Sequence, residues 1–272
     1  MRAIRSMGGK AKSMVLSRIG VIARTVFLEV IRDRILYLVA LFALVLVIAN
    51  VLLPDIAAGA QDKILLDLGL AGIHLLSVIV AVFVGTGLVN KEIEKRTVLV
   101  LIAKPVSRAE FIVGKHLGLT AVLAVLIAAL GLIFMVVLGV SGIPFDFGSI
   151  ALSLVFMVLE AALLVAVAIV FGVFTSSLLA TLLTFAVYLM GHLSQDLVAF
   201  GDLSDNPAVQ RLTNTLYLVL PDLERLNLRN EAVYGMGLLP SPPELLGHGL
   251  YGLLYTALLL TVAIVIFSRR QF

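Results

Sequence analysis

Long uncharged apolar stretches are the feature that most restricts the fold of this chain of 272 residues. Residues 35–53, ILYLVALFALVLVIANVLL, contain no Asp, Glu, Lys or Arg. A helix of about 20 such residues crosses about 30 Å of hydrocarbon. Charged residues make up only 14% of the chain, whereas a soluble domain has roughly a quarter. The sequence therefore predicts an all-α, polytopic membrane protein and excludes an ordinary soluble domain.

We predict six membrane spans from these stretches, with the bounds 35–53, 70–89, 108–139, 149–173, 178–198 and 246–267. The third stretch is long enough for its first turns to project into water before the chain enters lipid. Residues 35–267 would then form a six-helix transmembrane domain, which the segment 1–34 precedes and the tail 268–272 follows.

The distribution of Lys and Arg predicts which ends of the spans face the cytoplasm. With the N-terminus placed inside, eight of these residues lie in the N-terminal segment, six in the 90–115 loop and two in the C-terminal tail. Four lie outside: Lys63, Arg211, Arg225 and Arg229. Because basic residues accumulate on the cytoplasmic side of membrane proteins, we predict that both termini are cytoplasmic. The basic balance then reflects an anionic inner leaflet, and no nucleic-acid partner is expected.

Residues 17–34 show the alternation of faces that is typical of an amphipathic helix. The charged face carries Arg18, Arg24, Glu29 and Arg32, and the apolar face carries Ile19, Ile22, Val26, Phe27 and Val30. This pattern predicts a helix that lies along the inner membrane surface before the first span. A cytosolic extension of the first span is the alternative interpretation.

The segment 199–245 is the largest connection on the predicted outer side. Pro207 has a residue type suited to the first turn of a helix, and it precedes a partial helical stripe of Val209, Leu212, Leu216 and Leu220. We expect one or two short helices that rest on the outer face of the bundle.

The segment 90–115, NKEIEKRTVLVLIAKPVSRAEFIVGK, places charge and a proline between two spans. Asn90 stands where the second span leaves the membrane, and asparagine is a residue type that caps helix N-termini. Glu92 and Glu94 would then occupy the first turn of a short helix, where the helix dipole favours negative charge. Pro105 would end that helix, because proline disfavours helical conformation at the residue before it.

The motif SRAE predicts that a second helix starts after this proline. Ser107 and Glu110 have the spacing of a capping box, in which each side chain bonds the backbone N–H group of the other residue. The loop is thus expected to form two helices at an angle, with charge displayed to the cytoplasm. The apolar run 98–103 needs a covering surface, which the bundle, the bilayer interface or a partner would supply. A well-capped turn with basic anchors is the plainer alternative.

The stretch EIEKRTVLVLIAKPVSRAEFIVGKHLG resembles the cytoplasmic loop of ABC-2 type transporter permeases, in particular the six-span subfamily similar to multi-copper enzyme maturation permeases. The family pattern is Glu-x-Glu-x-Gly-Thr, a few apolar residues, Pro-x-Ser-Arg and then Gly-Lys. Arg96 stands where many members have glycine. The other pattern positions map onto Glu92, Glu94, Thr97, Pro105, Ser107, Arg108, Gly114 and Lys115.

This resemblance implies the transmembrane permease subunit of an ATP-binding cassette transporter, and an exporter rather than an importer. The implied partners are two copies of an ATP-binding subunit, which would hold ATP and Mg²⁺ and dock on the 90–115 loop. A second permease copy or a homologous permease would complete the assembly. The N-terminal helix resembles the elbow helix of such permeases. The implied location is a prokaryotic inner or plasma membrane.

Neither a catalytic residue nor a cofactor site is predicted in the chain itself. Gly114-Lys115 is followed by His116 and lacks the upstream glycine of a phosphate-binding loop. The four histidines are dispersed, so we predict that they pack at span ends or form hydrogen bonds at an interface, and that they hold no metal. His192 and Asp196, at positions i and i+4, are the one pair that suggests a metal or proton hypothesis.

Glu160 is the acidic residue in the middle of a predicted span. A carboxylate at the bilayer centre costs at least about 2.5 kcal/mol, so we expect Glu160 to face the bundle or a subunit interface. A residue of the substrate path, a conformational gate and a protonated or hydrogen-bonded packing residue are all compatible with this position. Two other functions stay open: a proton-coupled secondary transporter that uses Glu160, and a membrane assembly factor that transports nothing.

Glycines within the spans are candidates for close helix approach. Gly131, Gly139, Gly142 and the Gly85-Thr86-Gly87 cluster have this potential, although none of them forms a strict G-x-x-x-G pair. Local relief of packing is the simpler interpretation of these glycines.

Overall fold

The computed structural model describes residues 2–32, 35–94, 107–204 and 206–269, and every regular element in these ranges is helical. Two short 3₁₀ turns, η1 (Glu224–Leu226) and η2 (Met236–Leu238), lie in the outer connection. The predicted all-α fold is confirmed for this part of the chain. The α-helices are α1 (Arg2–Arg32), α2 (Ile35–Ile56), α3 (Gln61–Glu94), α5 (Arg108–Val140), α6 (Phe147–Phe174), α7 (Ser177–His192), α8 (Ser194–Asp202), α9 (Pro207–Val219), α10 (Arg229–Val233) and α11 (Pro242–Arg269).

Among the described helices, five are long and apolar enough to cross a membrane singly: α2, α3, α5, α6 and α11. The bent pair of α7 and α8 provides a sixth span if the two helices are counted together. These elements follow the order of the six predicted stretches, although α3 begins well before the predicted residue 70. The multi-pass helical architecture is therefore confirmed.

The predicted continuous span 178–198 is wrong at its outer end, because α7 and α8 meet at an angle of 63°. The Gly191 carbonyl oxygen accepts two hydrogen bonds, from the backbone N–H group of Leu223 and from the hydroxyl group of Ser194. Both donor–acceptor distances are 3.1 Å. A Cβ atom at Gly191 would lie 2.8 Å from the Pro221 carbonyl oxygen. The glycine thus allows the returning chain to approach the end of α7, and the helix stops there.

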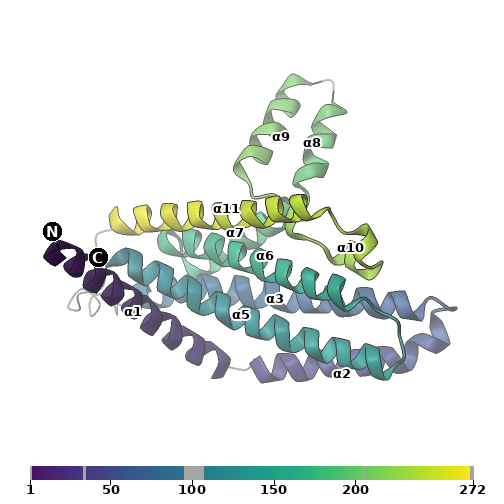
Figure 1. Cartoon of the computed structure of the whole chain (residues 1–272). Helices are drawn as coiled ribbons and strands as arrows, with labels where there is room; N and C mark the ends of the chain where they lie inside the picture. The colour runs from purple at the N-terminus through teal and green to yellow at the C-terminus, as the bar shows by residue number, and fades with distance from the viewer. Residues whose placement is uncertain (1, 33–34, 95–106, 205, 270–272) are drawn as a thin grey trace.

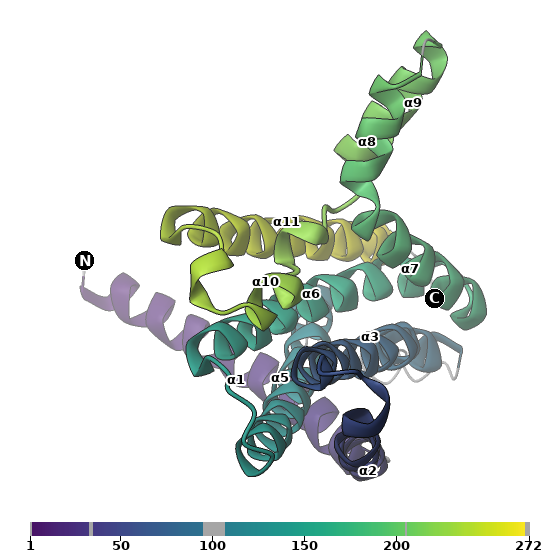
Figure 2. The same cartoon turned by 90° about the vertical axis from the view of Figure 1, so that its right-hand side faces the viewer.

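Helix α6 is the centre of the bundle, since 72% of its most apolar window is buried. Figure 2, viewed along the bundle, shows α3, α5, α7 and α11 around it. The buried share of the most apolar stretch is only 11% in α2 and 22% in α11, so most of the apolar surface of these two helices faces outward. Exposed apolar surface of this extent needs lipid or another chain to cover it. The exposure pattern agrees with a bundle that sits in a bilayer.

The flanks of the 90–115 loop lie at one end of the bundle, together with other helix ends. Figure 1 shows there the beginning of α1, the end of α3, the start of α5 and the end of α11. Both flanks of the 90–115 loop therefore lie at the same end of the bundle as the beginning of α1 and the end of α11, which agrees with the distribution of Lys and Arg. That this side faces the cytoplasm stays a prediction.

Helix α1 crosses α5 obliquely and packs against it at two glycines (Figures 1 and 2). A Cβ atom at Gly114 would lie 2.8 Å from the Ile22 Cβ atom, and one at Gly118 would lie 2.7 Å from the Ala23 carbonyl oxygen. Gly114 and Gly118 form a strict G-x-x-x-G pair, which our inspection of the span glycines overlooked. Part of the apolar face of α1 thus packs on α5, and its location along the membrane surface stays a prediction.

The glycines singled out from the sequence divide into two groups. A Cβ atom at Gly85 would lie 2.9 Å from the Ala168 Cβ atom, and one at Gly131 would lie 2.3 Å from Leu154 Cδ1. These two glycines therefore bring α3 and α5 close to α6. Gly139 and Gly142 show no such approach, because no atom of another described segment lies within 4 Å of a Cβ built at either position, which agrees with the simpler interpretation.

The outer connection contains two parts that lie in different places. Pro207 is in the first turn of α9 and Asn206 caps it, so the predicted helix start is confirmed. In both views the hairpin of α8 and α9 projects away from the bundle, whereas we predicted that it rests on the outer face (Figures 1 and 2). The two helices cover each other instead, with Gly201 directly against Thr213. Helix α10 does pack on the bundle, where the Ser149 hydroxyl group donates to the Ala232 carbonyl oxygen over 3.0 Å.

Candidate functional site

The first flank of the 90–115 loop is a continuation of α3, which runs to Glu94. The prediction that Asn90 caps a new helix is therefore wrong, and Glu92 and Glu94 lie in the last turns of α3 rather than in the first turn of another helix. A helix-capping residue needs a non-helical backbone, whereas Asn90 lies within the helix, so its residue type was not enough to start a new element there.

Asn90 is buried and connects α3 to two other helices. With its carboxamide oriented to satisfy both polar atoms, the NH₂ group donates to the carbonyl oxygens of Gly172 (3.0 Å) and Thr175 (2.9 Å), and the oxygen accepts from the Ser177 N–H group (3.1 Å). These partners are the end of α6 and the start of α7, whose terminal backbone groups lack bonds within their own helices. One side chain on α3 thus satisfies the turn between α6 and α7.

The central part of the predicted coupling loop lies outside the described residues. This applies to Arg96, Thr97 and Pro105, and to the predicted helix and apolar run 98–103. For Glu92 and Glu94 the structure describes the helical backbone. Their roles in coupling stay predictions.

The second flank begins with the predicted capping box, which is confirmed. The Glu110 N–H group donates to Ser107 Oγ over 3.1 Å, and the Ser107 N–H group donates to Glu110 Oε2 over 2.8 Å. Glu110 also lies 3.9 Å from the Arg18 guanidinium group of α1. The start of α5 is therefore fixed in direction and lies beside α1.

Arg108 connects this same helix start to the end of α11. Its guanidinium group donates to the Phe267 carbonyl oxygen over 2.8 Å and to the Ser268 carbonyl oxygen. The Phe111 and Phe267 rings stack beside it, with 5.7 Å between their centroids. A cation at the end of a helix bonds carbonyl groups that have no partner within the helix and complements its dipole.

Two further pattern residues lie in the packed interior rather than on a charged surface. Gly114 contacts α1, as described above, and Lys115 is 7% exposed with its Nζ atom 5.5 Å from the centroid of the Phe111 ring. The prediction that the whole segment displays its charge to the cytoplasm is therefore wrong for Lys115. The described part of the loop is a junction of α1, α5 and α11.

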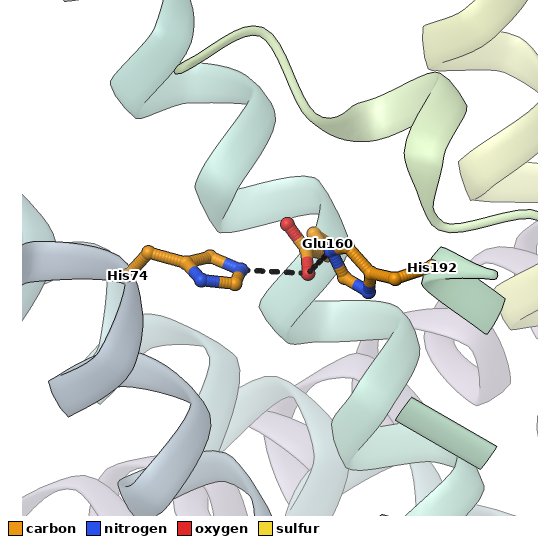
Figure 3. A group of neighbouring side chains, drawn as sticks. All are labelled: His74, Glu160 and His192. Carbon is orange, nitrogen blue, oxygen red and sulfur yellow. Dashed lines mark hydrogen bonds and ion pairs between the residues drawn. The ribbon is translucent and has the colours of Figure 1, made fainter. Parts of the chain in front are cut away.

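A second polar group lies inside the bundle, at Glu160. Glu160 of α6 is 1% exposed, and its Oε1 atom lies 2.8 Å from His74 Nε2 on α3 and 3.4 Å from His192 Nε2 on α7 (Figure 3). His74 is 3% exposed and His192 is half-buried. The ligand-type atoms of the three side chains all lie within 4.8 Å of one another. Polar side chains within a membrane bundle pair with one another in this way.

An aromatic ring lies beside this trio. The Tyr188 ring is 4.7 Å from the His192 ring and 5.9 Å from the His74 ring, between centroids. The trio of His74, Glu160 and His192 can form hydrogen bonds, or bind a proton or a metal cation, where the three helices meet.

The trio also corrects two sequence-based interpretations. His74 was predicted to pack at a span end or to form a hydrogen bond at an interface, and His192 was paired with Asp196. The structure brings both histidines to Glu160 inside the bundle, while Asp196 is exposed. The three positions are far apart in the chain, so local spacing contained no sign of their contact. The usable signal was the presence of ionisable residues within three different apolar stretches.

A polar cavity of about 550 Å³ lies in the outer connection. Arg225 Nε donates to Asp222 Oδ2 over 2.9 Å, and its NH2 group donates to the Tyr217 hydroxyl group over 3.0 Å. These bonds raise the pKa of Arg225 above its ordinary value and keep the guanidinium group charged. The residues that line the cavity are Glu224, Arg225, Asn227, Leu228, Glu231, Pro240 and His248.

Comparison with known families matches residues 21–272 to the ABC-2 family transporter proteins, which covers all the described helices except the beginning of α1. The chain belongs to the ABC-2 transporter family. It is therefore a membrane permease subunit of an ABC transporter and an integral, multi-pass membrane protein, with an ATP-binding cassette protein as its implied partner. No curated protein sequence matches the permease.

Proposed function

We propose that the permease is an exporter driven by ATP hydrolysis on a pair of separate ATP-binding subunits, which dock on the 90–115 loop. Each of these subunits would hold ATP and Mg²⁺, and the permease itself would hold no nucleotide. Nucleotide binding would bring the two subunits together and displace the loops, and the spans would shift between states that are closed and open to the outside.

The observation that carries this proposal is the connection of both loop flanks to the rest of the bundle. On the α3 side, Asn90 bonds the turn between α6 and α7. On the α5 side, Arg108 bonds the end of α11, and Gly114 packs on α1. Because hydrogen-bonded and closely packed helices move together, a displacement of the loop would reach α1, α6, α7 and α11.

Three finer features of the proposal rest on the resemblance of the loop. They are the outward direction of transport, membership of the six-span subfamily similar to multi-copper enzyme maturation permeases, and a location in a prokaryotic inner or plasma membrane. Two ATP-binding subunits require two docking loops, so the assembly would contain a second copy of the permease or a homologous one. Helix α1 would serve as the elbow helix at the inner surface.

Charge reversal in the loop tests the proposed docking surface. The change Glu92→Lys with Glu94→Lys should abolish co-purification of the ATP-binding subunit, or its stimulation by the permease, while the protein stays in the membrane. The matched control is Asp202→Lys, at the exposed end of α8. Normal stimulation of ATP hydrolysis by the double variant would show that the ATP-binding subunit docks elsewhere.

The two competing functions give different results in the same preparation. A proton-coupled transporter would continue to transport without ATP hydrolysis and would stop when a protonophore removes the proton gradient. An assembly factor would show no transport under either condition. Transport that requires ATP hydrolysis and survives the protonophore supports the ABC exporter.

A further inference from the structure

The trio of His74, Glu160 and His192 is built from three separate helices that meet at one point. His74 comes from α3, Glu160 from α6 and His192 from α7, and Figure 3 shows the two imidazole rings directed at the carboxyl group from opposite sides. Two imidazole nitrogens and a carboxylate oxygen are a common ligand set for zinc and related divalent metal ions. The resemblance of the 90–115 loop to ABC-2 permeases implies no binding site at these three residues.

A hydrogen bond to the backbone determines which ring nitrogen of His192 carries the hydrogen atom. His192 Nδ1 lies 3.2 Å from the Tyr188 carbonyl oxygen, and a carbonyl oxygen only accepts hydrogen bonds, so Nδ1 carries the hydrogen. In the neutral ring, Nε2 then presents its lone pair. Metal-binding histidines are typically held in this manner, with the other nitrogen donating to a backbone carbonyl group.

The contact between His192 and Glu160 is incomplete as it stands. His192 Nε2 lies 3.4 Å from Glu160 Oε1 and makes no hydrogen bond to any described residue. The second carboxyl oxygen, Glu160 Oε2, is likewise buried without a hydrogen-bond partner in the described part of the chain. A lone pair that faces a carboxylate is unfavourable in an apolar interior unless a proton or a metal ion lies between them.

We propose that His74, Glu160 and His192 bind a divalent transition-metal ion of the zinc class, which joins α3, α6 and α7 inside the membrane bundle. Three protein ligands leave a fourth position of a tetrahedral ion for water or another small ligand. This site is separate from the ATP-binding subunit and does not depend on the proposed direction of transport.

The distances are compatible with such an ion. Zinc–nitrogen bonds of about 2.0–2.1 Å place neighbouring ligand atoms of a tetrahedral site about 3.4 Å apart. Glu160 Oε1 lies 2.8 Å from His74 Nε2, which is shorter than this value, and 3.4 Å from His192 Nε2, which equals it. All the ligand-type atoms of the three residues lie within 4.8 Å of one another. A rotation of the carboxyl group can use its unpartnered oxygen, so only small movements of the side chains are needed.

The ligand set affects the choice of ion. Two imidazole nitrogens favour a transition-metal ion over Ca²⁺ or Mg²⁺, which prefer oxygen ligands. The Tyr188 ring lies against the His192 ring and restricts its rotation. An extra proton on His192 is the competing explanation of the arrangement, and it predicts that the site binds no metal.

The test uses Co²⁺ as a spectroscopic substitute for Zn²⁺ with the purified full-length permease, free of ATP-binding subunits. We expect about one Co²⁺ ion per chain, with the strong visible absorption of a four- or five-coordinate ion, and Zn²⁺ should displace it. The variants Glu160→Gln, His74→Asn and His192→Asn should each weaken Co²⁺ binding by more than the roughly 10–100-fold seen when a partner of a metal ligand is lost.

A matched control is His248→Asn, which removes a histidine from the outer cavity. This variant should bind Co²⁺ like the natural chain. Loss of binding in this variant together with unchanged binding in His74→Asn would overturn the proposal, and so would an absence of binding in the natural chain. Thermal unfolding of each variant without metal, compared with the natural chain, separates loss of a ligand from loss of the fold.

Discussion

The Arg108 guanidinium group at the start of α5 donates a hydrogen bond of 2.8 Å to the carbonyl oxygen of Phe267, near the end of α11. These residues are far apart in the sequence, and their bond connects the exit of the 90–115 loop to the last span. The arrangement gives the second loop flank a direct mechanical connection to a helix that is not adjacent to the loop in the sequence.

The first prediction removes this connection. Arg108→Ala should lower transport more than it lowers ATP hydrolysis, because the docking loop stays present while its bond to α11 is lost. Hydrogen bonds to charged groups contribute about 1.5–3 kcal/mol, and the exposed position of Arg108 reduces that contribution. The ratio of transport to ATP hydrolysis in proteoliposomes is the measurement. Arg108→Lys keeps one donor and should give an intermediate ratio, whereas an unchanged ratio in both variants would contradict the role.

The second prediction concerns Asn90. Asn90→Leu should destabilise the fold by about 1–3 kcal/mol, because it removes the partner of the buried Gly172 carbonyl oxygen and of the half-buried Thr175 carbonyl oxygen and Ser177 N–H group. The midpoint of thermal unfolding in detergent provides the measurement. Asn90→Asp discriminates further, since it retains the acceptor for Ser177 and loses both donors. Equal stability of the natural chain and Asn90→Leu would show that water satisfies these groups.

These two residues also show what could and could not be inferred from the sequence. Local signals predicted local structure well: Ser107 and Glu110 form the capping box, and Pro207 starts α9. Asn90 has the same kind of capping signal, yet it bonds a turn that lies 82 or more positions along the chain. Its partner was therefore decided by tertiary packing, which overrides local preference.

The intramembrane trio is the clearest case of a site that depends on packing. Glu160 was recognisable as a carboxylate in an apolar stretch, but neither His74 nor His192 lies within a helical turn of it. The bend after α7 adds to the difficulty, because it results from contact between Gly191 and the returning segment. Without an arrangement of the spans, the three ligand-type side chains could not be assigned to one place.

The third prediction tests the close approach of α1 to α5. Gly118→Val should destabilise the permease by about 1–3 kcal/mol, because even a Cβ atom at Gly118 would lie 2.7 Å from the Ala23 backbone oxygen. Thermal unfolding again gives the readout. Gly139→Ala is the control, since no described atom lies within 4 Å of its added Cβ and alanine favours a helix by about 0.5–1 kcal/mol over glycine. Similar behaviour of the two variants would contradict the described packing.

The last prediction concerns Glu160 itself. Glu160→Gln should leave membrane insertion unchanged, since an amide has a smaller desolvation cost than a carboxylate at this depth. It should alter transport or its coupling to ATP hydrolysis, because the amide keeps an oxygen for His74 but loses the negative charge that two imidazole rings face. Glu160→Asp retains the charge on a shorter side chain and should behave differently from Glu160→Gln if charge is what matters.

The comparison of these two variants separates a working group from a packing residue. If Glu160 only fills space and satisfies His74, Glu160→Gln should match the natural chain and Glu160→Asp should be the worse variant, because it leaves a gap beside His192. If the charge is needed, the order is reversed. Transport and ATP hydrolysis measured in the same proteoliposomes, at equal amounts of inserted protein, decide between the two orders. Since Glu160 connects α3, α6 and α7, a reversed order would place the control of the transport cycle at this junction.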